Sequence, residues 1–220
     1  MDALKEKEPM FSAKNMGLIK SPIIKDNPIT VQVLGICSAL AVTVKLEPAI
    51  VMAIAVTVVT AFSNLVMSFI RNITPSRIRI IVMLTVIAFM VIMVDQVLKA
   101  FLYDVSRQLS VFVGLIITNC ILMGRLEAFA ISNKPWPSFL DGIGNGLGYS
   151  WILVAVALVR EVLGSGTFFG IKLFDTPWWN LYELGYKDNG LMILPPMALI
   201  LVGVVIWVQR SRHRELIEKN

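Results

Sequence analysis

The chain has 220 residues, 56% of them hydrophobic, and its mean hydropathy is +0.74. This composition excludes an ordinary water-soluble domain and predicts an integral membrane protein in contact with the lipid bilayer. The net charge of +5 does not indicate a nucleic-acid partner, because the basic residues are dispersed among apolar segments and do not gather on one folded face.

The first half of the chain has a polar start followed by three apolar segments. Residues 1–27 carry five lysines and four acidic residues, so we expect a solvated tail there. Apolar segments follow at 28–44, 48–70 and 80–98. The first of these has only 17 residues, fewer than the roughly 20 that a helix needs to cross the hydrocarbon core.

The second half repeats this plan with segments at 109–124, 147–163 and 190–209, and it ends in a basic tail, 210–220. The segment at 109–124 is again short for a crossing. The stretch at 164–189 is rich in aromatic residues, as expected of a loop at the membrane interface.

A run of alternating glycines, at positions 142, 144, 146 and 148, precedes the fifth apolar segment. It superficially resembles a phosphate-binding loop, but no strand precedes it and no lysine follows at P-loop spacing. We therefore expect close helix packing or a bent entry to the membrane, where small residues let two backbones approach.

Charged residues within the apolar segments have two interpretations. Asp95, Arg160 and Glu161 could mark an ion path, as intramembrane charges often do. All three lie near segment ends, so we favour anchoring pairs. Lys99 follows Asp95 by one helical turn and is expected to pair with it.

Six apolar segments place both termini on the same side of the membrane. Fourteen lysines and arginines lie in the tails and loops on that side, and five lie in the opposite loops. Because basic residues accumulate on the cytoplasmic side, both termini are predicted to be cytoplasmic in a multi-pass protein.

Two segments of the chain resemble one another. Residues 31–47 and 111–127 share apolar positions and end in Lys-Leu-Glu and Arg-Leu-Glu, respectively, and each contains one of the two cysteines. We therefore predict an all-α membrane domain, residues 28–209, built from two inverted three-helix repeats at 28–100 and 109–209. The first and fourth segments would be broken half-helices that meet near the middle of the membrane.

Such a meeting would bring Cys37 and Cys120 together, and three roles remain open for them. A cysteine in a membrane helix is most often a packing residue. In a transporter-like site, broken helices hold an ion with backbone groups, and the thiols would be incidental. In an iron or [2Fe-2S] site the thiolates are ligands, but four are needed, so the other two would have to come from another copy or a related partner.

Several motifs resemble those of a known family. They are Asn27-Pro28, the segment 34–43 around Cys37, residues 95–100, the segment 109–120 ending in Cys120, and the glycine run at 141–149. Over about residues 27–209 the chain resembles the D subunits of the bacterial sodium-translocating NADH:quinone oxidoreductase. The related E subunits of the Rnf complex typically have proline where this chain has Ser38, and they tend to lack the Lys45-Leu46-Glu47 ending, so the Rnf alternative is less favoured.

The resemblance implies a membrane subunit of a six-subunit inner-membrane oxidoreductase that passes electrons from NADH to ubiquinone while moving sodium outward. It implies that Cys37 and Cys120 are two ligands of an iron–sulfur centre, expected to be [2Fe-2S], whose other two cysteines belong to a homologous E subunit of opposite orientation. Flavins, NADH and ubiquinone would bind elsewhere in the complex, so no activity is expected from the isolated chain.

Overall fold

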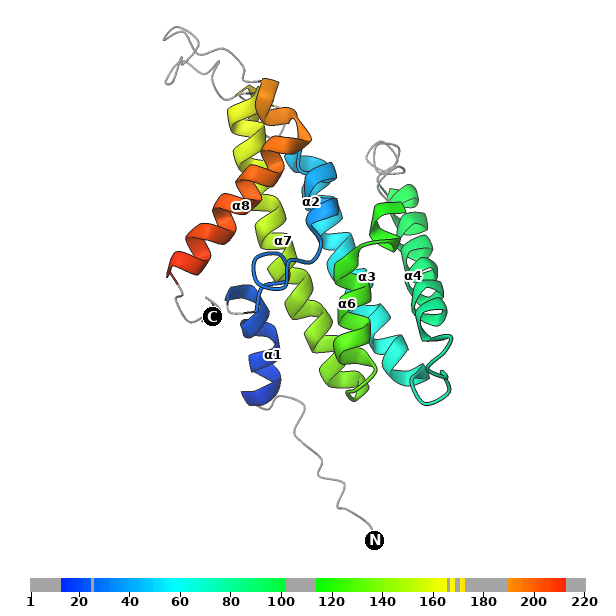
Figure 1. Cartoon of the computed structure of the whole chain (residues 1–220). Helices are drawn as coiled ribbons and strands as arrows, with labels where there is room; N and C mark the ends of the chain where they lie inside the picture. Colours follow the sequence, from blue (N-terminus) through cyan, green and yellow to red (C-terminus); the bar gives the residue numbers. More distant parts are fainter. Residues whose placement is uncertain are drawn as a thin grey trace, which may run out of the picture.

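The computed structural model describes residues 13–24, 26–101, 114–165, 167–168, 171–172 and 190–212. Its α-helices are α1 (Ala13–Ile24), α2 (Ile36–Val42), α3 (Leu46–Ile70), α4 (Arg79–Phe101), α6 (Cys120–Arg125), α7 (Pro135–Ser165) and α8 (Pro195–Arg212) (Figure 1). A π-helical turn (Leu126–Ala130), a 3-10 helix (Gly190–Ile193) and a pair of two-residue antiparallel strands, β1 (Thr167–Phe168) and β2 (Ile171–Lys172), complete the described elements.

Three helices are long and apolar enough to cross a membrane: Leu46–Ile70, Arg79–Phe101 and Pro135–Gly164. Helices α3 and α7 lie side by side along most of their length, and α4 packs on α3 (Figure 1). The prediction of a helical fold is therefore confirmed for the described residues, and the three long apolar helices are consistent with a membrane protein. The six crossings and the inverted repeats remain a prediction, because the structure describes only part of segments 109–124 and 164–189.

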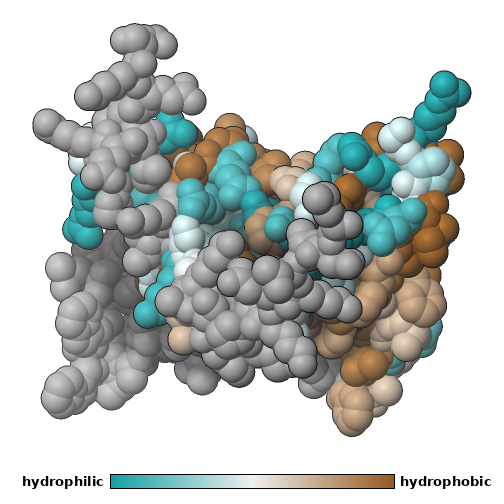
Figure 2. All heavy atoms as spheres, turned by 90° about the horizontal axis from the view of Figure 1, so that it is seen from below, coloured by the Kyte–Doolittle hydropathy of each residue, from teal (hydrophilic) through white to brown (hydrophobic). Residues whose placement is uncertain are grey.

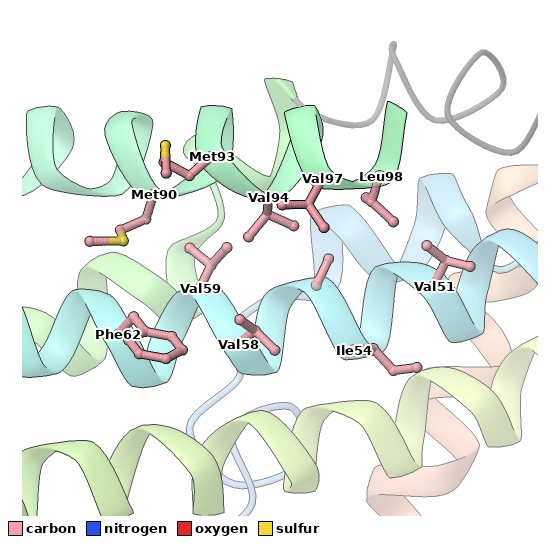
Figure 3. A pocket seen from close by; sticks show the side chains of 11 residues that line it. Val51, Ile54, Val58, Val59, Phe62, Met90, Met93, Val94, Val97 and Leu98 are labelled. Atoms are coloured by element: carbon pink, nitrogen blue, oxygen red, sulfur yellow. The ribbon is translucent and has the colours of Figure 1, made fainter. Parts of the chain in front are cut away.

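Exposed hydrophobic side chains cover the outer side of α4, including Ile81, Phe89 and Ile92, each more than half exposed. Figure 2 shows hydrophobic atoms gathered on one side of the molecule, as expected where a helix faces lipid. Between α3 and α4 lies an apolar pocket of about 470 Å³, lined by side chains that include Phe62 and Met90 (Figure 3).

The two short segments both contain breaks. In the first, residues 28–35 are irregular and α2 occupies only Ile36–Val42, with Gly35 before it in the left-handed conformation (φ +81°). In the second, a helical stretch at 114–117 is interrupted before α6 begins at Cys120. Broken helices were predicted from segment length, and in both cases a helix starts anew at or next to a cysteine.

The expectation of a solvated tail at 1–27 is wrong for residues 13–24. These form α1, which packs against α7 (Figure 1). A Cβ on Gly144 would lie 2.5 Å from the carbonyl oxygen of Leu18, and one on Gly148 would overlap the carbonyl of Pro22. The lysines of this segment indicated a solvated tail, but its helix packs on glycines that lie more than 120 positions later in the sequence.

The glycine run also belongs to α7, which begins at Pro135, twelve residues before the expected start of this segment at 147. Glycines 142 and 146 face α3, where an added Cβ would lie 2.7 Å from the Cα of Ala61 and of Thr57, respectively. Because the run is helical and lies against two neighbouring helices, the prediction of close helix packing is confirmed and a phosphate-binding loop is excluded.

The charged residues within the apolar segments differ in burial and in their partners. Lys99 Nζ pairs with Asp95 at 2.6 Å, as predicted. Arg160 and Glu161 were expected to be anchors, but they are only 1% and 5% exposed. Glu161 accepts a hydrogen bond from the backbone N–H at the start of α3, so its role is to hold neighbouring elements together.

Arg160 connects three elements through its guanidinium group. It donates to Thr43 Oγ1 (2.6 Å) just after α2, and to the carbonyl oxygens of Met192 (3.1 Å) and Ile193 (2.7 Å) in the 3-10 helix. The planar group satisfies several acceptors at once, which explains how this charge is tolerated in the interior.

Candidate metal centre

The structure brings Cys37 and Cys120 together, although 83 positions separate them in the sequence. Cys37 lies in the first turn of α2 and Cys120 is the first residue of α6. The residues next to them in the chain are hydrogen-bonded to each other: Asn119, before Cys120, donates from Nδ2 to Oγ of Ser38, after Cys37 (3.1 Å), so the two cysteines lie at the same place in the fold. Both thiols are free and exposed.

A buried polar network lies directly beneath the pair. Asn119 Nδ2 donates to Ser38 Oγ (3.1 Å), and the hydroxyl of Tyr149 on α7 lies 2.8 Å from the same oxygen. All three side chains are 0% exposed. Ser38 also donates to the carbonyl oxygen of Gly35 (2.9 Å), which fixes the left-handed turn before α2.

Sequence reasoning found the cysteines but missed these three residues. The available signal was that each cysteine has a polar neighbour in an otherwise apolar segment, Ser38 after the first and Asn119 before the second. Tyr149 gave no such signal, because only the packing of α7 against the two half-helices brings it beneath them.

The cysteine pair fits half of a four-ligand metal site. Among the described residues, no group of three or more histidine, cysteine, aspartate or glutamate side chains could hold a metal ion. Sulfur donors suit iron and iron–sulfur clusters. Because the two thiols are exposed on the surface, a second protein could supply the remaining ligands from outside.

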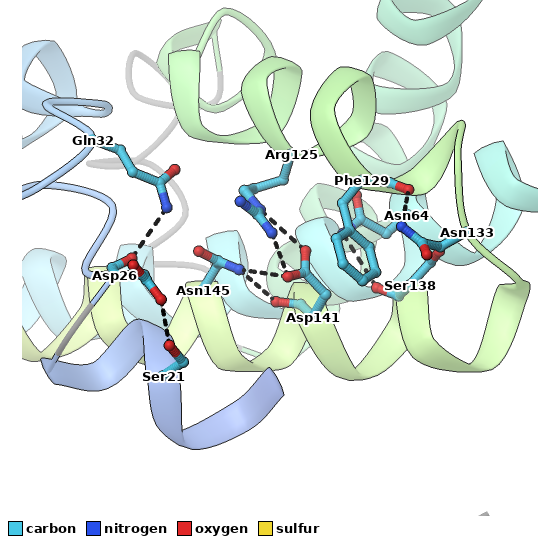
Figure 4. Close-up of polar contacts among 10 residues, drawn as sticks. All are labelled: Ser21, Asp26, Gln32, Asn64, Arg125, Phe129, Asn133, Ser138, Asp141 and Asn145. Atoms are coloured by element: carbon cyan, nitrogen blue, oxygen red, sulfur yellow. Dashed lines mark hydrogen bonds and ion pairs between the residues drawn. The ribbon is translucent and has the colours of Figure 1, made fainter. Parts of the chain in front are cut away.

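A second polar cluster surrounds Asp141 of α7, which is 2% exposed (Figure 4). Arg125 makes a bidentate ion pair with the Asp141 carboxylate, with Nε 3.0 Å from Oδ2. Asn145 Nδ2 donates to the Asp141 backbone carbonyl (2.9 Å) and to its Oδ1 (3.0 Å). No sequence signal singled out this ion pair, because Arg125 was expected in a loop.

This cluster borders a half-polar pocket of about 310 Å³, also lined by Ser21, Asp26 and Gln32. Asn145 Oδ1 is buried and has no hydrogen-bond partner among the described residues. Its orientation is determined, because Nδ2 must face the two acceptors on Asp141. A buried acceptor without a protein partner is uncommon, and this one borders the pocket.

Comparison with known proteins identifies the family of the chain. A family model described as "Rnf-Nqr subunit, membrane protein" covers residues 15–206, most of the chain. The chain belongs to the Rnf-Nqr family of membrane subunits. Both cysteines, the polar network and α7 lie within the matched region.

Relatives within the Rnf-Nqr family are similar over nearly their whole length. The chain is 60% identical over 201 residues to a protein of Tolumonas auensis, covering 90% of this chain and 91% of the relative. It is 57% identical over 214 residues to a protein of Shewanella baltica (strain OS155), covering 95% and 99%. Both relatives are named as the D subunit of the Na(+)-translocating NADH-quinone reductase.

Proposed function

We propose that this chain is the D-type membrane subunit of a sodium-translocating NADH:quinone oxidoreductase. In this proposal Cys37 and Cys120 hold half of an iron–sulfur centre, expected to be [2Fe-2S], and a homologous subunit of opposite orientation holds the other half. The names of the relatives support the complex. The observation that carries the site is the pair of exposed cysteines on two broken helices, whose neighbours Ser38 and Asn119 are hydrogen-bonded to each other.

The residues of the chain have three tasks in this function. Cys37 and Cys120 would bind iron as thiolates, and an iron–sulfur centre so bound exchanges single electrons. The helix breaks place both thiols on one exposed face, where a partner can approach. The long apolar helices α3, α4 and α7 support a multi-pass inner-membrane subunit, in which both termini are expected in the cytoplasm.

A ligand deficit makes the partner necessary. Two thiolates leave a four-coordinate iron shell half open, and isolated anionic sulfur is costly in a medium of low dielectric constant. Two cysteines from a homologous, inverted subunit would close the shell. Flavins, NADH and ubiquinone are then expected on other subunits of the six-subunit complex.

The test uses the intact complex with Cys37→Ser or Cys120→Ser. We expect each variant to lose iron and acid-labile sulfide and to stop quinone reduction, while NADH oxidation by artificial acceptors continues. Thr118→Ala is the matched control, because Thr118 is an exposed residue two positions before Cys120 whose hydroxyl, among the described residues, bonds to the nearby carbonyl of Gly114. Serine variants with full iron content and full quinone reduction would show that the thiols are incidental.

A second candidate function is that the chain lines part of the sodium path, with the cysteines incidental. The observation that favours it is the pocket where the unpartnered Asn145 Oδ1 lies near the carboxylate of Asp26 (Figure 4). Hard cations prefer oxygen ligands. Under this alternative Asp26→Asn would raise the sodium concentration needed for half-maximal quinone reduction and leave the iron content unchanged.

The control for this second test is Glu127→Gln, which removes an exposed carboxylate paired with Arg79 on another part of the surface. An unchanged sodium dependence in Asp26→Asn, or an equal shift in Glu127→Gln, would rule out a sodium role for the pocket.

A further inference from the structure

The short helices that carry the cysteines cannot hold their own positions. Helix α2 has seven residues and α6 has six, and isolated helices of this length are unstable. Tertiary contacts must therefore hold them, and three hydrogen bonds near the cysteines meet at the hydroxyl of Ser38.

Hydrogen-bond capacity determines the direction of every bond in this network. A serine hydroxyl has one hydrogen and two acceptor sites. Ser38 uses its hydrogen on the carbonyl of Gly35, and one acceptor site receives Asn119 Nδ2. With the Ser38 hydrogen on the Gly35 carbonyl, the second acceptor site of Ser38 receives the hydroxyl of Tyr149, at 2.8 Å.

The side-chain oxygen of Asn119, the remaining polar group of the network, also has a hydrogen-bond partner. Asn119 Oδ1 accepts the backbone N–H of Ile121 (3.3 Å) and so caps the start of α6. The network thus joins the first turn of α2, the first turn of α6 and the middle of α7. A buried network whose members are all satisfied stabilises one arrangement against alternatives.

We propose that Tyr149 is a positioning residue for the cysteine pair, a role that rests on the proposed iron–sulfur function. Its hydroxyl, carried by the 31-residue helix α7, holds Ser38 and through it keeps α2 in place against α6. Its ring also packs on Gly35, where an added Cβ would lie 3.1 Å from the ring. The same Cβ position lies 3.5 Å from Oδ1 of Asn119, so Gly35 packs between Tyr149 and the residue that precedes Cys120, and a displacement of Tyr149 alters this packing.

The test compares three variants of the intact complex. Tyr149→Phe keeps the ring and removes the donor, and Ser38→Ala removes the acceptor. Ser150→Ala is the control: it removes a hydroxyl from the next residue of α7, one that bonds to α3 at Thr57 Oγ1 (3.1 Å) and the Ala53 carbonyl (3.1 Å), away from the cysteines.

The first readout is the electron paramagnetic resonance signal of the centre during a redox titration. Hydrogen bonds near the sulfurs tune the reduction potential of such centres. We expect a shifted potential and an altered signal in Tyr149→Phe and in Ser38→Ala, no shift in Ser150→Ala, and a double variant that shifts no further than the larger single one.

The second readout does not depend on a native iron centre. After iron removal by a chelator, copper phenanthroline as oxidant should form a Cys37–Cys120 disulfide, and we expect this reaction to be several-fold slower in Tyr149→Phe than in wild type or Ser150→Ala. If Tyr149→Phe does not assemble, Ser38→Ala answers the question through the same two readouts.

The outcomes separate the two proposals. If the wild-type complex contains no iron and Tyr149→Phe still slows disulfide formation, the proposed function is wrong and the positioning role stands. An iron-containing complex in which Tyr149→Phe matches wild type in both readouts would overturn the positioning role alone. Equal effects in Ser150→Ala would also overturn it, because any lost hydrogen bond on α7 would then suffice.

Discussion

Replacing Gly146 by alanine tests the packing of α7 against α3, which share the most extensive contact between helices in the described structure. The new Cβ would lie 2.7 Å from the Cα of Thr57 and 2.8 Å from its Cγ2. Carbon atoms at optimal separation are about 3.5–4.0 Å apart, so the two helices would have to separate by about 1 Å. Overpacking of this kind costs about 1–3 kcal/mol.

Gly203→Ala in α8 is the matched control, because an added Cβ there meets no described atom within 4 Å. Both substitutions gain the same helix propensity, up to about 1 kcal/mol, so the difference between them isolates the packing cost. We expect thermal unfolding in detergent to give a free energy of unfolding about 1–3 kcal/mol lower for Gly146→Ala than for Gly203→Ala. Equal stability of the two variants would refute the close approach of α3 and α7.

Three further predictions concern other parts of the chain. Asn27→Ala removes a buried side-chain amide that donates to the Gly148 carbonyl (2.9 Å) and accepts from the backbone N–H of Ile29 in the turn that follows Asn27. The free energy of unfolding should therefore fall by about 1–3 kcal/mol in thermal denaturation, and a change under about 0.5 kcal/mol would contradict this. Arg160→Lys replaces a planar donor by a point charge that cannot reach Thr43 and the 3-10 helix together. The free energy of unfolding should fall by about 2–3 kcal/mol in the same assay. An unchanged free energy of unfolding would show that the positive charge alone is sufficient. A reporter fused after Lys219 should be active only in its cytoplasmic form, and periplasmic activity would reverse the assigned orientation.

Hydropathy and repetition were sufficient to determine several properties from the sequence alone. The apolar composition determined a helical membrane protein, because the bilayer interior leaves a single chain few other ways to satisfy its backbone. The shortness of segments 28–44 and 109–124 indicated broken helices, and their likeness singled out Cys37 and Cys120. The i,i+4 spacing of Asp95 and Lys99 predicted their ion pair. These are local signals, read within one or two helical turns or by comparing one segment with another.

Contacts between distant segments were decided only by the tertiary structure. Helix α1 looked like a solvated tail because its packing partner, the glycine face of α7, lies more than 120 positions away. Arg160 looked like an anchor because the groups that it binds, the Thr43 hydroxyl and the Ile193 carbonyl, lie on opposite sides of it in sequence. Tyr149 ends the motif 141–149, but nothing in that motif signalled a contact with the cysteine segments, since its bond to Ser38 joins positions 111 residues apart. Periodicity and spacing describe what a segment can do by itself, whereas the satisfaction of buried polar groups depends on which segments meet.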